Sequence, residues 1–173
     1  NGEEMWRFST GGAIASTPLI HNGVLYFGSF DRKFYAINLD GTEKWRFEDA
    51  GSWFWGKAVA YDDIIIAGCL DHRVYALYAD SGEQAWQPYQ AGGQVRADSA
   101  LVGELVILGS EDGKVYALRA GTGALAWVFT ADGPIRAALF ASESTVYVHT
   151  VVGTLYALET EHGTRLWSVT TSG

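Results

Sequence analysis

A tryptophan recurs along this 173-residue chain at an almost constant interval, and this regularity restricts the possible folds more than any other feature. The successive intervals are 39, 41, 41 and 40 residues. A Tyr-Ala pair recurs independently, at intervals of 40, 41 and 40 residues. A period of this length indicates a chain that repeats one supersecondary unit. The tryptophans are Trp6, Trp45, Trp86, Trp127 and Trp167, and the tyrosines are Tyr35, Tyr75, Tyr116 and Tyr156.

Each unit reads as four β-strands joined by tight turns. In the first unit, the apolar run 13–21 leads through Asn22 and Gly23 to a second run, and Asp40 with Gly41 precedes the last strand. Asn-Gly and Asp-Gly supply the positive φ that short hairpins need, and β-branched and aromatic residues favour strands. Four such strands in about 40 residues are typical of one propeller blade. The sequence therefore predicts an all-β propeller of four-stranded antiparallel blades.

A motif inside the repeats resembles a known family. The spacing Tyr-Ala-Leu-x-x-x-x-Gly-x-x-x-Trp occurs as YALYADSGEQAW, YALRAGTGALAW and YALETEHGTRLW. It is similar to the tryptophan-docking motif of PQQ-like repeats, which build quinoprotein alcohol dehydrogenases and the non-enzymatic propeller lipoprotein of outer-membrane assembly. The resemblance covers essentially the whole chain and implies that the five tryptophans are docking residues. It does not select an activity, because one fold hosts unrelated functions.

The repeat count predicts an incomplete ring. We place four PQQ-like repeats at residues 12–48, 52–90, 93–131 and 133–171 of a single domain, with residues 1–11 as the outer strand of a preceding or closing blade. Rings of the family typically close with seven or eight blades. The open ends of a half propeller would expose apolar flanks, which soluble proteins avoid. We therefore expect a second copy to close the ring, as a homodimer or higher closed oligomer. A fragment of a longer chain and a four-bladed ring are the alternatives.

Charge and hydropathy limit the classes of partner. The chain has 12 basic and 20 acidic residues, a net charge of −8, and its few basic residues are scattered through the repeats. We expect no nucleic-acid partner, because nucleic-acid surfaces need a basic patch. No apolar run approaches the length of a membrane span, so we expect no membrane insertion. The resemblance favours an extracytoplasmic location over a cytoplasmic one.

Superposing the repeats separates shared residues from unusual ones, and the stretch GSWFWGK at 51–57 contains the most unusual. Its central residue, Phe54, falls at a position that is apolar in every repeat, which predicts a core residue. The two flanking positions share no chemistry among the repeats. The three aligned sets are Ala13, Trp53, Gln94 and Pro134; Ile14, Phe54, Val95 and Ile135; and Ala15, Trp55, Arg96 and Arg136.

These flanking positions are the candidate ligand site. If they begin the innermost strand, which lines the central channel, Trp53 and Trp55 share a face opposite Phe54 near one mouth. Trp55 with two guanidinium groups could hold a ligand that carries a carboxylate or an aromatic ring. Alternatively, the tryptophans fill space between blades, and the arginines pair with Asp98 or a neighbouring carbonyl. The candidate ligand-binding residues are Trp53, Trp55, Lys57, Arg96, Asp98 and Arg136.

The sequence predicts no metal centre. His21, His72 and His162 lie in or beside predicted turns of different blades, and His149 replaces a glycine that the other repeats share. Zinc needs three or four converging ligands, which this spacing does not provide. Three aspartates also recur at one turn, where we expect Asp to favour positive φ and to cap backbone N–H groups. They are Asp31, Asp71 and Asp112.

The sequence also predicts no catalytic residue, because it has neither a nucleophile elbow nor a phosphate-binding glycine loop. The resemblance implies that quinoprotein enzymes hold PQQ against an adjacent pair of cysteines, whereas this chain has only Cys69. We therefore expect no PQQ and no enzyme. The predicted function is a non-catalytic module for protein–protein interaction, scaffolding or ligand sensing. A fragment of a PQQ-dependent oxidoreductase, or a binder of small anionic or aromatic ligands at the channel mouth, are the alternatives.

Overall fold

The computed structural model describes residues 2–171, and these residues form four four-stranded antiparallel sheets without a helix. The strands of every sheet are hydrogen-bonded in chain order, so the predicted blades are confirmed. Blade 1 holds β1 (Leu19–His21), β2 (Val24–Gly28), β3 (Phe34–Asn38) and β4 (Glu43–Phe47). Blade 2 holds β5 (Val59–Tyr61), β6 (Ile64–Gly68), β7 (Arg73–Tyr78) and β8 (Tyr89–Gln90). Blade 3 holds β9 (Ala100–Val102), β10 (Leu105–Gly109), β11 (Lys114–Arg119) and β12 (Leu125–Thr130). Blade 4 holds β13 (Phe140–Ala141), β14 (Thr145–His149), β15 (Thr154–Glu159) and β16 (Arg165–Thr170).

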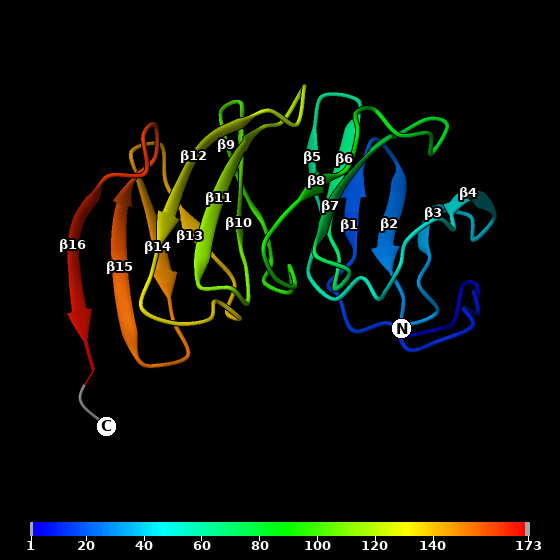
Figure 1. Cartoon of the computed structure of the whole chain (residues 1–173). Coiled ribbons are helices and arrows are strands. Elements are labelled where there is room, and N and C mark those ends of the chain that lie inside the picture. The colour runs from blue at the N-terminus through cyan, green and yellow to red at the C-terminus, as the bar shows by residue number, and fades with distance from the viewer. Residues whose placement is uncertain (1, 172–173) are drawn as a thin grey trace.

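The blades stand side by side in chain order and form an open row (Figure 1). Blade 1 lies at one end of the row and blade 4 at the other, so the ring is not closed. The first strands of blades 2, 3 and 4 contact one another in turn, which makes them the innermost strands. The structure therefore agrees with the predicted partial propeller.

The core lies between the blades, because each inner blade has a neighbour on both faces. For this reason the middle strands are buried on both sides, and every residue of β6 is buried. At the first junction, Phe34 of blade 1 packs edge-on against Phe54 of blade 2, with ring centroids 5.2 Å apart. Phe54 in turn packs edge-on against Tyr75 at 5.7 Å. Phe54 is fully buried, as its aligned position predicts.

Among residues 2–171, four of the five repeated tryptophans, all except Trp167, each dock on a glycine of the following blade. The ring of Trp45 covers Gly82, where a Cβ atom would lie only 2.7 Å from the indole, and its Nε1 donates to the carbonyl of Ala79 at 2.9 Å. The glycine in each Gly-x-x-x-Trp motif therefore serves the tryptophan of the preceding repeat and not its own. The docked pairs are Trp6 on Gly41, Trp45 on Gly82, Trp86 on Gly123 and Trp127 on Gly163.

The first docked tryptophan lies on a segment that forms no strand. Residue 1 of the expected outer strand 1–11 lies outside the described residues, and residues 2–11 have no strand hydrogen bonds. A strand needs a partner strand to pair with, and among the described residues no strand pairs with this segment. Trp6 still donates from Nε1 to the carbonyl of Leu39 at 2.8 Å, and Phe8 packs edge-on against Tyr35 at 5.6 Å.

A second glycine position fixes the inner part of each junction. Gly28 ends β2, and a Cβ there would collide with the Cβ of Phe54 in the next blade. Gly68 and Gly109 stand in the same relation to residues of blades 3 and 4. The residues that these glycines meet belong to the aligned set that is apolar in every repeat. Residues that align in sequence therefore occupy equivalent positions in their blades. The pairs are Gly28 with Phe54, Gly68 with Val95, and Gly109 with Ile135.

In each of blades 1 to 3, an aspartate in the turn between the second and third strands accepts a hydrogen bond from a tyrosine of the third strand. In blade 2, the hydroxyl of Tyr75 donates to Asp71 at 2.7 Å, and the amide of Gly51 donates to the same carboxylate at 2.8 Å. Burial, assisted by the bond to Asp71, raises the pKa of Tyr75 to about 12. The positive φ in this turn belongs to the following residue, His72, and not to the aspartate as we expected. The carboxylate does cap backbone N–H groups, those of Gly51 and Arg73, as we expected.

In blade 4 the equivalent carboxylate comes from a different position of the repeat. Val152 stands where the other blades have aspartate, and Asp132 stands where blade 3 has Gly92. Asp132 accepts hydrogen bonds from the hydroxyls of Thr150 at 2.9 Å and Thr154 at 2.5 Å. The bond from Thr154 is the main reason that the pKa of Asp132 lies below its ordinary value. The two changes therefore compensate each other.

We expect the substitutions Val152→Asp and Asp132→Gly to couple strongly. Val152→Asp alone places two carboxylates together, since a Cβ at the equivalent Gly92 would meet the carboxylate of Asp112. Asp132→Gly alone removes the carboxylate. The double variant restores the arrangement of blades 1 to 3, so its free energy of unfolding should exceed the additive expectation by about 0.5–3 kcal/mol. Urea unfolding of the four proteins measures this coupling, and simple additivity would contradict it.

Candidate functional site

Trp53 and Trp55 contact Phe30 in the turn that follows β2, and β2 and β16 both end at the lower edge in Figure 1. Trp53 and Trp55 precede β5, which begins only at Val59. They were expected at the start of the innermost strand, but they belong to the loop before it. The reason is that Trp53 accepts a hydrogen bond through its carbonyl from the amide of Leu70, in the β6–β7 turn, at 3.0 Å. The alternation nevertheless holds, because Phe54 is buried while Trp53 is 42% exposed.

Both tryptophans stack on one ring of blade 1. Phe30, in the turn between β2 and β3, lies 4.6 Å from Trp53 and 4.9 Å from Trp55 between ring centroids. The interplanar angles are 13° and 29°, so both contacts are stacked. The tryptophans therefore do fill space between blades, as the alternative proposed. Trp53 still presents a large part of its surface to solvent.

Arg96 packs on this group of aromatic rings. Its guanidinium carbon lies 3.8 Å from the centroid of the Trp55 ring, which is cation–π geometry. Asp98 does not bind this arginine; its Oδ1 accepts a hydrogen bond from the backbone amide of Lys57 at 2.7 Å. Lys57 is thus joined to the group through its main chain. We call Phe30, Trp53, Trp55 and Arg96 the mouth patch.

The second arginine of the aligned pair lies apart from the mouth patch. Arg136 binds Glu111 with two hydrogen bonds of 2.9 Å, from Nε and Nη2. Arg96 occupies the equivalent position in blade 3, but the residue equivalent to Glu111 one blade earlier is Leu70. Among the described residues, no carboxylate lies within ion-pair distance of Arg96. The structure therefore joins Trp53, Trp55 and Arg96, and it separates Arg136 from them.

Sequence reasoning missed two residues of this region, Phe30 and Glu111. Both stand at one position of the repeat, whose other occupants are Leu70 and Val151. This position differs in every repeat, which is the signal that singled out Trp53 and Trp55. The side chain at this position contacts the loop before the first strand of the next blade, as Phe30 and Glu111 show.

Cys69 is a core residue. Its side chain is fully buried, and its Sγ lies 3.4 Å from the carbonyl oxygen of Trp53. Burial raises the pKa of the thiol to about 12, so it stays protonated at neutral pH. The equivalent residues of the other blades are Ser29, Ser110 and Thr150, all of which are also buried.

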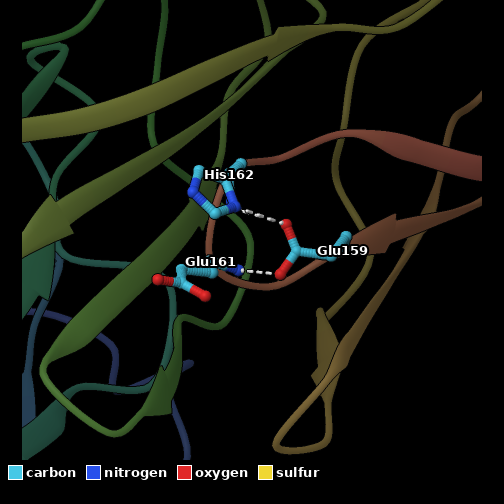
Figure 2. Close-up of side chains that lie close together, drawn as sticks. All are labelled: Glu159, Glu161 and His162. Carbon is cyan, nitrogen blue, oxygen red and sulfur yellow. Dashed lines mark hydrogen bonds and ion pairs between the residues drawn. The ribbon is translucent and has the colours of Figure 1, made fainter.

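One acidic cluster has the composition of a metal site, but its geometry is that of a turn. The ligand atoms of Glu159, Glu161 and His162 lie within 4.8 Å of one another. Figure 2 shows that the Glu159 carboxylate faces the backbone of the β15–β16 turn, where it accepts the amides of Glu161 at 2.7 Å and His162 at 2.8 Å. These bonds, that from Glu161 first, hold the pKa of Glu159 below its ordinary value. The carboxylate therefore caps the turn.

A polar groove lies beside the outer strand of blade 2. Its volume is about 390 Å³. At this place β8 consists of only Tyr89 and Gln90, which pair with β7, and Gln87 and Pro88 stand between Trp86 and the strand. Sequence reasoning did not identify this groove. The lining residues are Asp49, Arg73, Tyr75, Gln84, Gln87, Pro88 and Gln90.

Comparison with known proteins identifies the family. A PQQ-repeat family described as outer membrane protein assembly factor BamB matches residues 1–105 and 70–173, which together span the whole chain. The chain belongs to this family. The predicted PQQ-like repeat is therefore confirmed. No curated protein matches the chain at the level of sequence.

Solved structures extend this likeness to the fold. BamB from Moraxella catarrhalis superposes with a TM-score of 0.74 at 18% identity, over 95% of this chain and 66% of its own. The quinohemoprotein alcohol dehydrogenase of Comamonas testosteroni gives 0.81 at 15% identity, over 92% and 35%. The computationally designed Ika4 protein gives 0.80 at 20% identity, over 92% and 99%.

These proportions limit what the likeness implies. The chain spans about two thirds of that BamB and about a third of the dehydrogenase. At identities of 15–20%, these similarities show the fold of the chain and nothing about its activity. Within residues 2–171, there is no helix with the length and hydropathy to cross a membrane.

Proposed function

We propose that this chain is a non-catalytic propeller module that binds a protein partner through the mouth patch. The observation that carries the proposal is the stacked group of Trp53, Trp55 and Arg96, which is held in place by Phe30 and partly exposed. Tryptophan and arginine dominate the energetic centres of protein interfaces. Because the rings are already stacked, little side-chain entropy is lost on binding. The family description, an assembly factor for outer membrane proteins, supports an interaction role and an extracytoplasmic location.

The chemistry of Arg96 indicates what the partner presents. A guanidinium group stacked on a ring keeps its N–H edge available for a carboxylate. Arg136 shows this pairing within the chain, since it holds Glu111 with two hydrogen bonds. Arg96 has Leu70 at the corresponding position. We therefore expect the bound segment to place a carboxylate against Arg96 and an apolar or aromatic side chain on Trp53.

Random linear peptides displayed on phage provide a test. Peptides selected on the full chain should lose affinity by about tenfold or more in the Trp53→Ala and Arg96→Ala variants, as measured by calorimetry. Trp167→Ala and Arg165→Ala are matched controls, because these exposed residues of β16 lie outside the mouth patch. Selected peptides that bind both patch variants as tightly as the native chain would contradict the proposal.

A fragment of a PQQ-dependent oxidoreductase is the second candidate, because the chain superposes on quinohemoprotein alcohol dehydrogenases. Its residues do not fit the quinone site that the sequence resemblance implies. That site uses two adjacent cysteines, whereas the one thiol of this chain, Cys69, is buried between blades 1 and 2. Titration with PQQ and Ca²⁺ separates the two functions. We expect neither an absorbance change nor thermal stabilisation; both together would favour the oxidoreductase.

A further inference from the structure

Two irregularities of the repeat meet at the polar groove beside blade 2, which we call the blade 2 groove. The first is the loop that leaves blade 1. Four residue steps separate Phe47 from Gly51, whereas three steps separate the equivalent residues at 8–11, 89–92 and 129–132. This longer loop contributes Asp49 to the lining of the groove.

The second irregularity is the outer strand of blade 2. Three steps separate Trp86 from Tyr89, whereas two steps separate every other repeated tryptophan from its equivalent of Tyr89. The longer segment contributes Gln87 and Pro88 to the same lining. The two departures from the repeat are about 40 residues apart in the sequence, and they build one groove.

The two charged side chains of the blade 2 groove lie at the same end of it. Asp49 comes two residues before Gly51, whose amide donates to the carboxylate of Asp71 at 2.8 Å. Arg73 comes two residues after Asp71 and donates its own amide to that carboxylate at 3.0 Å. Both side chains are exposed, and among the described residues neither lies within ion-pair distance of an opposite charge. This end of the groove therefore offers one unpaired carboxylate and one unpaired guanidinium.

The guanidinium of Arg73 is held in position by Gln90. Its Nε donates to Oε1 of Gln90 at 3.3 Å. The Nε2 of Gln90 donates in turn to the carbonyls of Ala91 at 3.1 Å and His72 at 3.3 Å. These bonds orient the arginine through Nε and bring no carboxylate to its two Nη groups. An oriented guanidinium is the preferred partner of a carboxylate, because it can donate two parallel hydrogen bonds.

The rest of the blade 2 groove is polar and uncharged. Gln84 lies opposite Leu77 of β7, four residues along the strand from Arg73, which is a distance of about 13 Å. Gln87 follows Gln84 in the chain, and both side chains are exposed. A glutamine amide both donates and accepts hydrogen bonds, so it can pair with another amide or with a hydroxyl group.

We propose that the blade 2 groove binds a free α-amino acid with an uncharged polar side chain. Arg73 holds the α-carboxylate and Asp49 holds the α-ammonium group, since these two opposite charges share one carbon atom and need partners at one end of a site. The side chain of the amino acid runs toward Gln87 and Gln84. The volume of the groove, about 390 Å³, is that of a small-molecule site.

The lining favours an amino acid over a sugar. Sugar sites commonly offer the exposed face of an aromatic ring. Tyr75 is the one aromatic residue of the lining; it is 1% exposed, and its hydroxyl is bound to Asp71. The charged pair at one end of the groove also has no counterpart on a neutral sugar.

NMR titration of the isotope-labelled chain with L-glutamine tests this proposal. At millimolar concentration, L-glutamine should shift the amide signals of Arg73, Gln87 and Gln90 and leave those of the mouth patch in place. N-acetyl-L-glutamine has no ammonium group, and L-glutaminamide has no carboxylate. Each should bind about tenfold or more weakly than L-glutamine.

Three variants locate the site. Arg73→Met and Asp49→Asn should each weaken L-glutamine binding by about tenfold or more. Their matched controls are Lys114→Met, at the position of Arg73 in blade 3, and Asp63→Asn, an exposed aspartate outside the groove. Deletion of Pro88 gives the outer strand the length that it has in the other repeats. This deletion should abolish binding and leave the chain folded, as urea unfolding would verify.

Four results would overturn the proposal. The first is the absence of any shift with L-glutamine, L-asparagine, L-serine and L-threonine. The second is equal binding by Arg73→Met and Lys114→Met. The third is equal binding of L-glutamine and its two blocked derivatives. The fourth is a response of the groove to D-glucose and not to amino acids, which would assign it to carbohydrate. Trp53→Ala and Arg96→Ala should bind L-glutamine as the native chain does, so the proposed function is tested separately.

Discussion

Replacing Trp45 with alanine should lower the free energy of unfolding by about 3–5 kcal/mol, the usual cost of removing a buried tryptophan. The indole is 9% exposed, packs against Tyr26 and Phe34, and lies directly on Gly82. Its removal leaves a cavity between blades 1 and 2, which the backbone of two sheets cannot collapse to fill. The carbonyl of Ala79 stays satisfied, because the hydroxyl of Tyr26 also donates to it at 3.1 Å. The loss is therefore one of packing.

Trp167→Ala is the matched control for Trp45→Ala. It removes the same residue from the same motif position, but from a side chain that is 44% exposed and docks on no glycine of the described residues. We expect a loss of less than about 1 kcal/mol, as for surface substitutions. Urea unfolding followed by circular dichroism measures both variants. Equal losses would show that the tryptophan stabilises its own blade and not the junction.

The second large effect is expected from Gly68→His, which places the natural residue of blade 4 at an internal junction. A Cβ at Gly68 would lie 2.9 Å from the Cβ of Val95, and the site is buried between blades 2 and 3. Overpacking costs about 1–3 kcal/mol, and a buried imidazole without a partner adds to this. We expect the variant to unfold at a markedly lower urea concentration, or not to fold.

The smaller change Gly68→Ala keeps this prediction testable if the histidine variant does not fold. It should cost about 1–3 kcal/mol. The reciprocal control is His149→Gly, which should cost less than about 1 kcal/mol, because His149 is exposed and only the backbone entropy of glycine in a strand opposes folding. A Gly68→Ala variant as stable as the native chain would show that the junction can open without loss.

Most of the fold was predictable because the same pattern of strands and turns occurs in four repeats. The period, the turn residues and the docking motif each define the blade independently. Superposition of the repeats also separated Phe54 from Trp53 and Trp55, since a position that stays apolar in every repeat is a core position. Residues 53 to 55 lie before the strand and not in it, which the sequence does not reveal, because strand bounds depend on which segments donate hydrogen bonds.

The composition of the site was less predictable. Arg96 and Arg136 are equivalent in sequence, yet one stacks on Trp55 and the other binds Glu111. What decides between them is the residue that each loop meets on the preceding blade, and this requires knowledge of the junction. The exchange of a carboxylate between Asp132 and Val152 was missed for the same reason. Each change looks like an isolated irregularity until the structure shows that Asp132 binds the hydroxyls of Thr150 and Thr154, on either side of Val152.

The offset between each tryptophan and its glycine has a consequence for how such chains grow and diverge. Each of the first three repeats carries a tryptophan that docks on the next repeat and a glycine that receives the tryptophan of the previous one. A whole repeat can therefore be duplicated or deleted while the junctions on either side remain matched. Blades 1 to 3 are interchangeable in this sense. Blade 4 is not, since a copy of it at an internal position would bring His149 against the apolar residue of the next blade. The chain can therefore be lengthened by duplicating any of the first three repeats, but not by duplicating the fourth.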